Sequence, residues 1–155
     1  MFNRVAIRAL LLTITLAASA PGQNLRYVYS AKVVCGDPRA LEGQGAVPQP
    51  YVTSINVHNW GDSITTLMKS LIVTIPPGFQ RPVRPIRLAL DTLRRGEALA
   101  TDCADLRRRR QGLPAFFEGF VVIESPRPLN VVAVYSVPGG IDVVQIAERD
   151  RSPQR

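Results

Sequence analysis

The chain has 155 residues, a formal net charge of +7, and a composition of 46% hydrophobic and 20% charged residues. This is the composition of an ordinary globular protein, and the length suits one domain rather than two. Beyond the first twenty residues, no apolar run is long enough to form a transmembrane helix.

The first twenty residues have the pattern of an export signal. Arg4 and Arg8 precede an apolar run from Ala9 to Ala18, and the small residues Ala-Ser-Ala follow. The run is too short to span a bilayer, so residues 1–20 predict a cleaved signal peptide and a secreted or periplasmic protein. Because Pro21 would hinder cleavage after Ala20, the alternatives are a cut after Ser19 or an uncleaved membrane anchor.

Loss of Arg4 and Arg8 would leave 17 basic and 12 acidic residues, a net charge of about +5. This balance favours anionic partners, which outside the cytoplasm are lipids, acidic glycans or envelope polymers rather than nucleic acid. A solvated, arginine-rich surface is the alternative. Another envelope protein and a second copy of the chain also stay open as partners, and no cofactor is expected.

The first half of the chain predicts three strands, because apolar residues alternate with a period of two and turn residues interrupt them. Residues 26–35 form the first strand, and a polar loop over 39–49 follows it. Residues 51–59 form the second strand and 67–75 the third. Between these two, Asn59-Trp60-Gly61-Asp62 predicts a turn in which Asn59 and Asp62 supply side-chain hydrogen bonds and Gly61 adopts a positive φ.

The second half predicts a short strand over 86–90, a strand over 99–103 and one helical turn over 105–110, ended by Gly112 and Pro114. Residues 118–124 are continuously apolar at their centre, which predicts a strand covered on both faces. The last predicted elements are strands over 129–137 and 141–147 and a charged, frayed tail over 149–155.

These elements predict an all-β fold. About seven or eight short strands without βαβ spacing indicate an antiparallel two-sheet sandwich of immunoglobulin-like size, with at most one short helical turn. The sandwich would form a single domain over residues 25–148.

The two cysteines, Cys35 and Cys103, are expected to pair as a disulfide, because an exported chain meets an oxidising compartment. Two separate buried thiols are the alternative.

Several strand segments resemble known proteins. They are Tyr51–Asn59, Asp102-Cys103, Gly119–Ser125 and Leu129–Tyr135. The pattern is similar to short secreted bacterial β-sandwich proteins of unassigned activity and, more loosely, to the β-sandwich of the sensory rhodopsin transducer family. The resemblance implies a fold and transfers no functional residue.

A second resemblance concerns Gly61-Asp62-Ser63-Ile64-Thr65, which is similar to the nucleophile block of GDS-type esterases. That family also needs oxyanion donors and a late Asp-x-x-His, which the sequence does not contain. The single histidine, His58, precedes Ser63 and is interpreted as a half-exposed polar residue. A hydrolase that uses Ser63 is therefore the weakest functional hypothesis, and no catalytic residue is assigned.

Three acidic residues, Asp91, Asp102 and Asp105, could offer oxygen ligands to a cation. They lack the spacing of a calcium loop, and one histidine with two paired cysteines cannot complete a zinc site. Salt bridges to neighbouring arginines are the preferred interpretation, and no metal ligand is assigned.

Two segments remain as speculative ligand-binding residues. Arg107, Arg108, Arg109 and Arg110 are expected to fan out from an exposed turn, where they would bind phosphate or sulfate groups or form a solvated face. Trp60, in a turn, would stack on a sugar or cap one end of the sandwich.

The sequence as a whole predicts an exported, non-enzymatic interaction or structural module of the cell envelope or extracellular space. The rival hypothesis is a domain that binds carbohydrate or polyanion.

Overall fold

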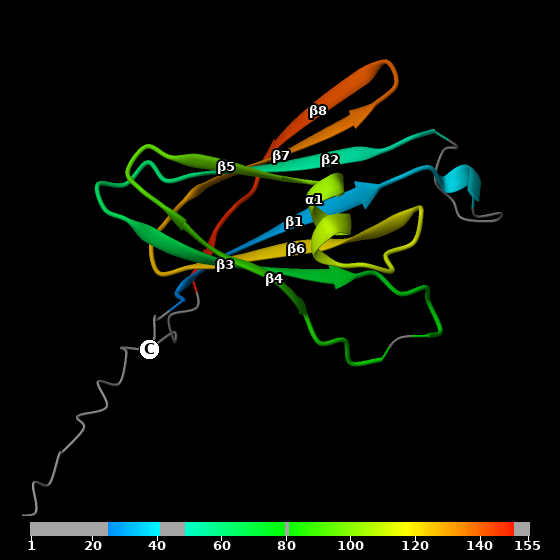
Figure 1. The fold of residues 1–155 in the computed structure, drawn as a ribbon, viewed down its shortest axis with the longest axis horizontal. Helices are drawn as coiled ribbons and strands as arrows, with labels where there is room; N and C mark the ends of the chain where they lie inside the picture. Colours follow the sequence, from blue (N-terminus) through cyan, green and yellow to red (C-terminus); the bar gives the residue numbers. More distant parts are fainter. Residues whose placement is uncertain (1–24, 41–48, 80, 151–155) are drawn as a thin grey trace, which may run out of the picture.

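The computed structural model describes residues 25–40, 49–79 and 81–150. These residues form two antiparallel sheets packed face to face (Figure 1). The predicted all-β sandwich is therefore confirmed. The predicted signal peptide lies outside the described residues.

The larger sheet has the strand order β4-β3-β6-β1-β9. In chain order its strands are β1 (Tyr27–Cys35), β3 (Thr65–Val73), β4 (Ile86–Leu93), β6 (Phe117–Ser125) and β9 (Arg149–Asp150). The smaller sheet has the order β5-β2-β7-β8. Its strands are β2 (Val52–His58), β5 (Ala98–Asp102), β7 (Asn130–Val137) and β8 (Gly140–Gln145).

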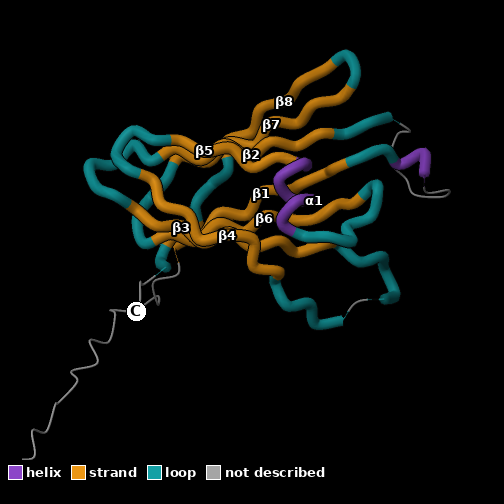
Figure 2. The backbone as a smooth tube through the Cα atoms, in the orientation of Figure 1, coloured by secondary structure: helices purple, strands orange, loops and turns teal. Residues whose placement is uncertain are grey.

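Two short helices complete the described chain, a 3-10 turn over Pro38–Ala40 and the helix α1 (Cys103–Arg109). Figure 2 shows α1 between the levels of the two sheets. Asp102 caps its N-terminus, because the Asp102 carboxylate accepts from the Asp105 N–H and the Asp105 carboxylate accepts from the Asp102 N–H. This reciprocal cap explains why the helix begins at Cys103, two residues before the predicted helical turn.

The core is built from the inward-facing residues of both sheets, as the alternating pattern predicts. In the larger sheet they are Tyr29, Ala31, Val33, Leu67, Leu71, Val121 and Ile123, and in the smaller sheet Ile55, Val57, Val131 and Ala133. All of these side chains are at most 1% exposed. Burial of each large aliphatic side chain contributes on the order of 2 kcal/mol, which makes this layer the main source of stability.

The prediction that the strand over 118–124 is covered on both faces is wrong. β6 is the central strand of its sheet, but its side chains alternate between core and outer face, and Phe120 is 37% exposed on the outer face. The run Phe120–Ile123 is continuously apolar because the outer side chains pack against neighbours on the sheet surface. There, the Lys32 ammonium lies 5.4 Å from the Phe120 ring centroid.

The predicted disulfide is confirmed. Cys35 ends β1 and Cys103 begins α1, with their Cα atoms 5.6 Å apart across the two layers. Beside it, Gly36 has a φ of +103°, and a Cβ on Gly36 would lie 1.8 Å from the Ala115 carbonyl oxygen. Only glycine fits this position, which brings the end of β1 against the segment that leads into β6.

Several boundaries differ from the predicted ones, most by one or two residues, and three of the differences have a clear cause in strand pairing. β3 begins at Thr65 rather than at 67, because Thr65 and Thr66 pair with Leu93 and Thr92 of β4. β4 extends to Leu93 for the same reason. Arg149 and Asp150, predicted to be frayed, form β9 by pairing with Val28 and Tyr27 of β1. No helix among the described residues is long and apolar enough to cross a membrane.

Candidate binding site

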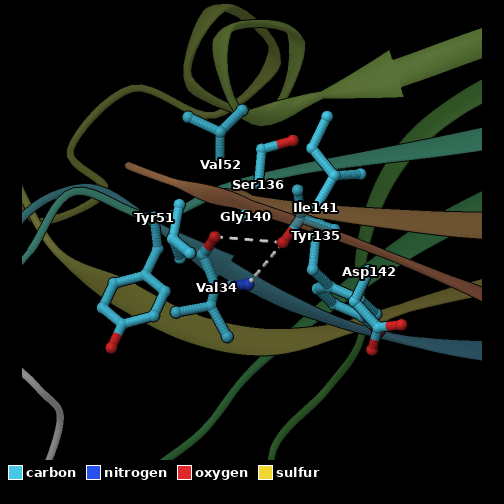
Figure 3. Close-up of a pocket in the computed structure, with 10 residues that line it drawn as sticks. Val34, Tyr51, Val52, Tyr135, Ser136, Gly140, Ile141 and Asp142 are labelled. Atoms are coloured by element: carbon cyan, nitrogen blue, oxygen red, sulfur yellow. Dashed lines mark hydrogen bonds between the residues drawn. The ribbon is translucent and has the colours of Figure 1, made fainter.

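An open cleft of about 370 Å³ lies where the end of β1 and the start of β2 meet the β7–β8 hairpin (Figure 3). Its lining comes from β1, from the segment that enters β2 and from both strands of the hairpin. The lining residues are Val34, Tyr51, Val52, Thr53, Tyr135, Ser136, Val137, Gly140, Ile141 and Asp142. Most of these side chains are apolar, and the volume lies within the range of small-molecule and side-chain binding sites.

The hairpin forms one wall because it extends away from the rest of the sandwich (Figure 1). Its two-residue turn consists of Pro138 and Gly139, and Gly139 has a φ of +86°. Proline followed by glycine at positive φ is the pattern of a type II turn, which matches the twist of a strand pair less well than the primed turns do. The two strands nevertheless stay paired without a register shift, from Val137 opposite Gly140 to Val132 opposite Gln145.

The opposite wall is fixed by hydrogen bonds between the sheets. The Thr53 hydroxyl donates to the Val34 carbonyl and accepts from the Val34 N–H, both at 3.0 Å, as the dashed lines in Figure 3 show. Gly36 and Tyr51 exchange two backbone bonds of 2.9 and 2.8 Å. These contacts and the Cys35–Cys103 bridge hold this wall rigidly in place.

Two polar side chains of the cleft, Thr53 and Tyr135, have hydrogen-bond partners within the protein. The Tyr135 hydroxyl donates to the Lys32 carbonyl at 3.1 Å, and burial together with the nearby Asp142 carboxylate raises the pKa of Tyr135. Asp142 carries the one ionised side chain of the lining and is exposed. The cleft is thus suited to an apolar group, with a carboxylate at its rim.

Trp60 lies elsewhere, on a loop that follows β2, and is 62% exposed. The loop is held by the buried Asn59, whose side-chain N–H groups donate to the carbonyls of Ser63, Leu93 and Arg94 at 2.8 to 3.1 Å. The Asn59 carboxamide oxygen accepts from the Gly61 N–H at 3.1 Å. Trp60 is therefore an exposed ring on a loop that the buried Asn59 side chain holds in place.

The predicted role of Gly61 in this turn is wrong, because Gly61 is not among the glycines with positive φ. The predicted side-chain hydrogen bond of Asn59 is confirmed, since the Asn59 carboxamide oxygen accepts from the Gly61 N–H.

The four consecutive arginines do not act as one exposed group. Arg107 donates to the carbonyls of Pro114 and Ala115, both at 2.7 Å, and its guanidinium lies 5.3 Å from the Phe117 ring centroid. Arg108 pairs with Asp105 and lowers the pKa of that carboxyl, mainly through their hydrogen bond. The expectation of an exposed, fanned side chain is wrong for Arg107, because the helix places Arg107 against the following loop. Arg108 is 74% exposed, and its pair with Asp105 is the one expected of a solvated face. Arg109 and Arg110 are exposed.

The structure also places the residues that were considered for catalysis and metal binding. His58 is half-buried on the outer face of β2, and in the described chain no hydrogen bond joins it to Ser63. Asp102 and Asp105 cap α1, whereas Asp91 lies 2.8 Å from the Lys69 ammonium. Among the residues that the structure describes, no group of three His, Cys, Asp or Glu residues could hold a metal ion.

Sequence reasoning missed the ion pair of Lys69, whose side chain is 3% exposed. Its ammonium also donates to the Thr101 hydroxyl at 2.8 Å, so it connects β3 of one sheet with β5 of the other. A lysine on the inward-facing side of an apolar strand was the available signal. The cleft was missed as well, because its walls come from segments far apart in the sequence.

Comparisons with known proteins give information on the fold alone. No family model and no curated protein matches the chain. The crystal structure of Thermotoga maritima 1070 is similar, with a TM-score of 0.51 and 11% identity, over 82% of this chain and 97% of that one. The resemblance to the sensory rhodopsin transducer family stays a prediction.

Proposed function

We propose that the chain is an exported, non-enzymatic β-sandwich module that binds a partner through the cleft beside the β7–β8 hairpin. The observation that carries this proposal is the cleft itself, which is lined mainly by apolar residues and has one wall held by a disulfide. A water-exposed apolar surface in a binding cleft is a favourable place for the apolar group of a ligand.

Export is supported by two independent features. Residues 1–20 have the pattern of a signal peptide, and Cys35 and Cys103 form a bridge of the kind that persists in oxidising compartments. The envelope and the extracellular space are therefore the proposed sites of action.

A neutral fluorescent dye such as Nile red tests the cleft, because it reports apolar sites without attraction to arginine. We expect the exported protein to bind the dye and Ile141→Asp to weaken binding at least about tenfold, since the new carboxylate would meet the apolar lining. Leu90→Asp is the matched control, because Leu90 is similarly exposed, at 68% against 73% for Ile141, but lies on β4. Equal weakening by both variants would refute the cleft as the binding site.

A second candidate function, carbohydrate binding, is favoured by Trp60. An exposed indole on an anchored loop has the rigidity that stacking against a sugar ring requires. Quenching or a spectral shift of the single tryptophan by soluble envelope glycans would support it, and Trp60→Ala should then lose glycan binding as measured by titration calorimetry. Unchanged tryptophan fluorescence across a series of glycans would refute carbohydrate binding.

A further inference from the structure

The outer edge of β8 carries backbone groups that no strand of the described chain pairs with. Val137 and Gly140 flank the two-residue turn and so form a hydrogen-bonded pair, and such pairs alternate along an antiparallel ladder. The bond from the Ile146 N–H to the Val131 carbonyl, at 2.9 Å, continues this alternation. The N–H and C=O groups of Ile141, Val143 and Gln145 therefore face away from β7.

The other strands at sheet edges are protected. β9 has two residues and β5 leads directly into α1. β4 carries Arg87 and pairs with β3 through a bulge. Short strands, charged residues and irregular pairing are the devices that prevent edge-to-edge association.

β8 lacks most of these devices, and Asp142 is its one charged residue. It is six residues long and contains no Pro, Lys or Arg. Ile141 is 73% exposed and Val143 is 61% exposed. A regular, apolar and exposed edge of this kind is a template for a further strand.

The charge distribution indicates that this further strand comes from a second copy of the chain. Two copies of the exported chain, with a net charge of about +5 once Arg4 and Arg8 are lost, repel each other. Between Arg127 and Arg149, however, there is no basic residue, and the charged residues are the acidic Asp142 and Glu148. The hairpin thus carries no basic residue, so two copies can approach along β8 without bringing arginines of the hairpins together.

We propose that two copies associate by antiparallel pairing of β8 with β8, which joins their smaller sheets into one continuous sheet. This inference rests on the proposed function, since it names a second copy as the partner of the hairpin. With the twofold axis at Val143, Val143 lies opposite Val143 of the second copy. Ile141 lies opposite Gln145 of the second copy. About six backbone hydrogen bonds then form, from the groups that face away from β7.

This register also places the one charged residue of β8 favourably. Asp142 lies opposite Val144 of the second copy rather than opposite its own counterpart. A register centred on Asp142 would bring two carboxylates together, which is destabilising. The axis at Val143 is therefore the specific form of the proposal.

Sedimentation equilibrium of the protein purified after export tests the association. We expect a monomer–dimer equilibrium, and we expect Val143→Lys to raise the dissociation constant at least about tenfold, because it places two ammonium groups face to face. Leu90→Lys, the matched control on β4, should leave the equilibrium unchanged. A protein that stays monomeric up to about 200 µM, where contacts of micromolar affinity are populated, would overturn the inference.

Cysteine cross-linking tests the register. Val143→Cys should form a disulfide-linked dimer under mild oxidation, because paired strands bring Cα atoms within about 5.5 Å. Ile141→Cys should not link to itself but should link to Gln145→Cys. Linkage of Ile141→Cys to itself as readily as Val143→Cys would contradict the proposed axis.

The two proposals fail separately. A monomer that binds Nile red, with the effect of Ile141→Asp intact, contradicts the dimer and leaves the binding cleft standing. A dimer whose cleft binds no dye contradicts the cleft and leaves strand pairing standing.

Discussion

The two outer strands of the smaller sheet lie in opposite environments. β5 is followed by Cys103, which is bridged to the other sheet, and its Thr101 receives a hydrogen bond from the buried Lys69. β8 is exposed along its whole length and contacts the protein through β7. The disulfide and the ion pair of Lys69 thus lie near β5, whereas β8 has a free edge and forms one wall of the apolar cleft.

This contrast separates stability from binding. Interactions that join the two sheets near β5 restrict the fold and leave little surface for a partner. The hairpin has few such interactions, so substitutions on it should alter binding with little effect on folding. Substitutions that break contacts between the sheets should therefore lower the free energy of unfolding, whereas substitutions on the hairpin should weaken binding.

Removal of the disulfide should have the largest effect on stability. The bridge closes a loop with a sequence separation of 68 residues, and the double variant Cys35→Ala, Cys103→Ala should lose about 4 kcal/mol of unfolding free energy. Urea unfolding of the oxidised wild type and the variant measures the difference. A loss below about 1 kcal/mol would show that the bridge does not constrain the chain as described.

Asn59→Ala should have the next largest effect. Asn59 is 1% exposed and its side chain donates to three carbonyls, so the variant leaves buried acceptors without partners and should lose about 2 kcal/mol. Asn56→Ala is the control, because Asn56 is half-buried on the outer face of β2, the strand that precedes Asn59. Similar losses in both variants would contradict the anchoring role of Asn59.

Tyr29 should make stability depend on pH in the alkaline range. Burial is the main cause that raises the pKa of Tyr29 to about 12, from 10.0. Because the folded state holds the proton more tightly, this contribution is complete below pH 10 and is lost as the pH rises towards 12. The loss should be on the order of 2 kcal/mol.

Urea unfolding between pH 9 and pH 12 measures this dependence. In Tyr29→Phe the alkaline loss should be smaller. The variant should also be less stable at neutral pH, because the Leu129 N–H loses its acceptor, which lies at 2.7 Å. An unchanged alkaline slope in Tyr29→Phe would refute the assignment to this residue.

The smallest effect on stability is expected for Arg109→Gln with Arg110→Gln, since both side chains are exposed. If they bind a polyanion, the double variant should elute from heparin at lower salt with an unchanged melting temperature. Elution at the same salt concentration would show that Arg109 and Arg110 bind no polyanion and are part of a solvated surface. Arg107→Gln is the structural contrast, because its bonds to Pro114 and Ala115 should make that variant melt at a lower temperature.

Much of the fold could be predicted from the sequence, because period-two alternation of apolar residues reports directly which side chains enter the core. The disulfide could be predicted from cysteine number and compartment. That only one face of β6 is covered could not be predicted, because an apolar residue such as Phe120 can also lie on an outer face beside Lys32. The positive φ expected of Gly61 failed because the Asn59 side chain supplies the turn.

The candidate site was much less predictable. Val34, Tyr51 and Ile141 meet only after both sheets have formed, so no local pattern marks the cleft. The arginine run was overestimated because the sequence does not show that Arg107 contacts the Pro114 and Ala115 carbonyls. Exposure of β8 depends on its position at the edge of the sheet, which alternation alone does not reveal.

The central claim, that binding occurs on the β8 side, is tested most directly by mapping one ligand over the whole surface. Octyl glucoside below its micellar concentration offers an alkyl chain to the cleft and a sugar to Trp60, and amide chemical shifts of the exported protein report which site responds. The account predicts that shifts cluster at Val34, Val52 and Ile141 around the cleft. Shifts confined to Trp60 and Ile64, with the cleft unchanged, would contradict it.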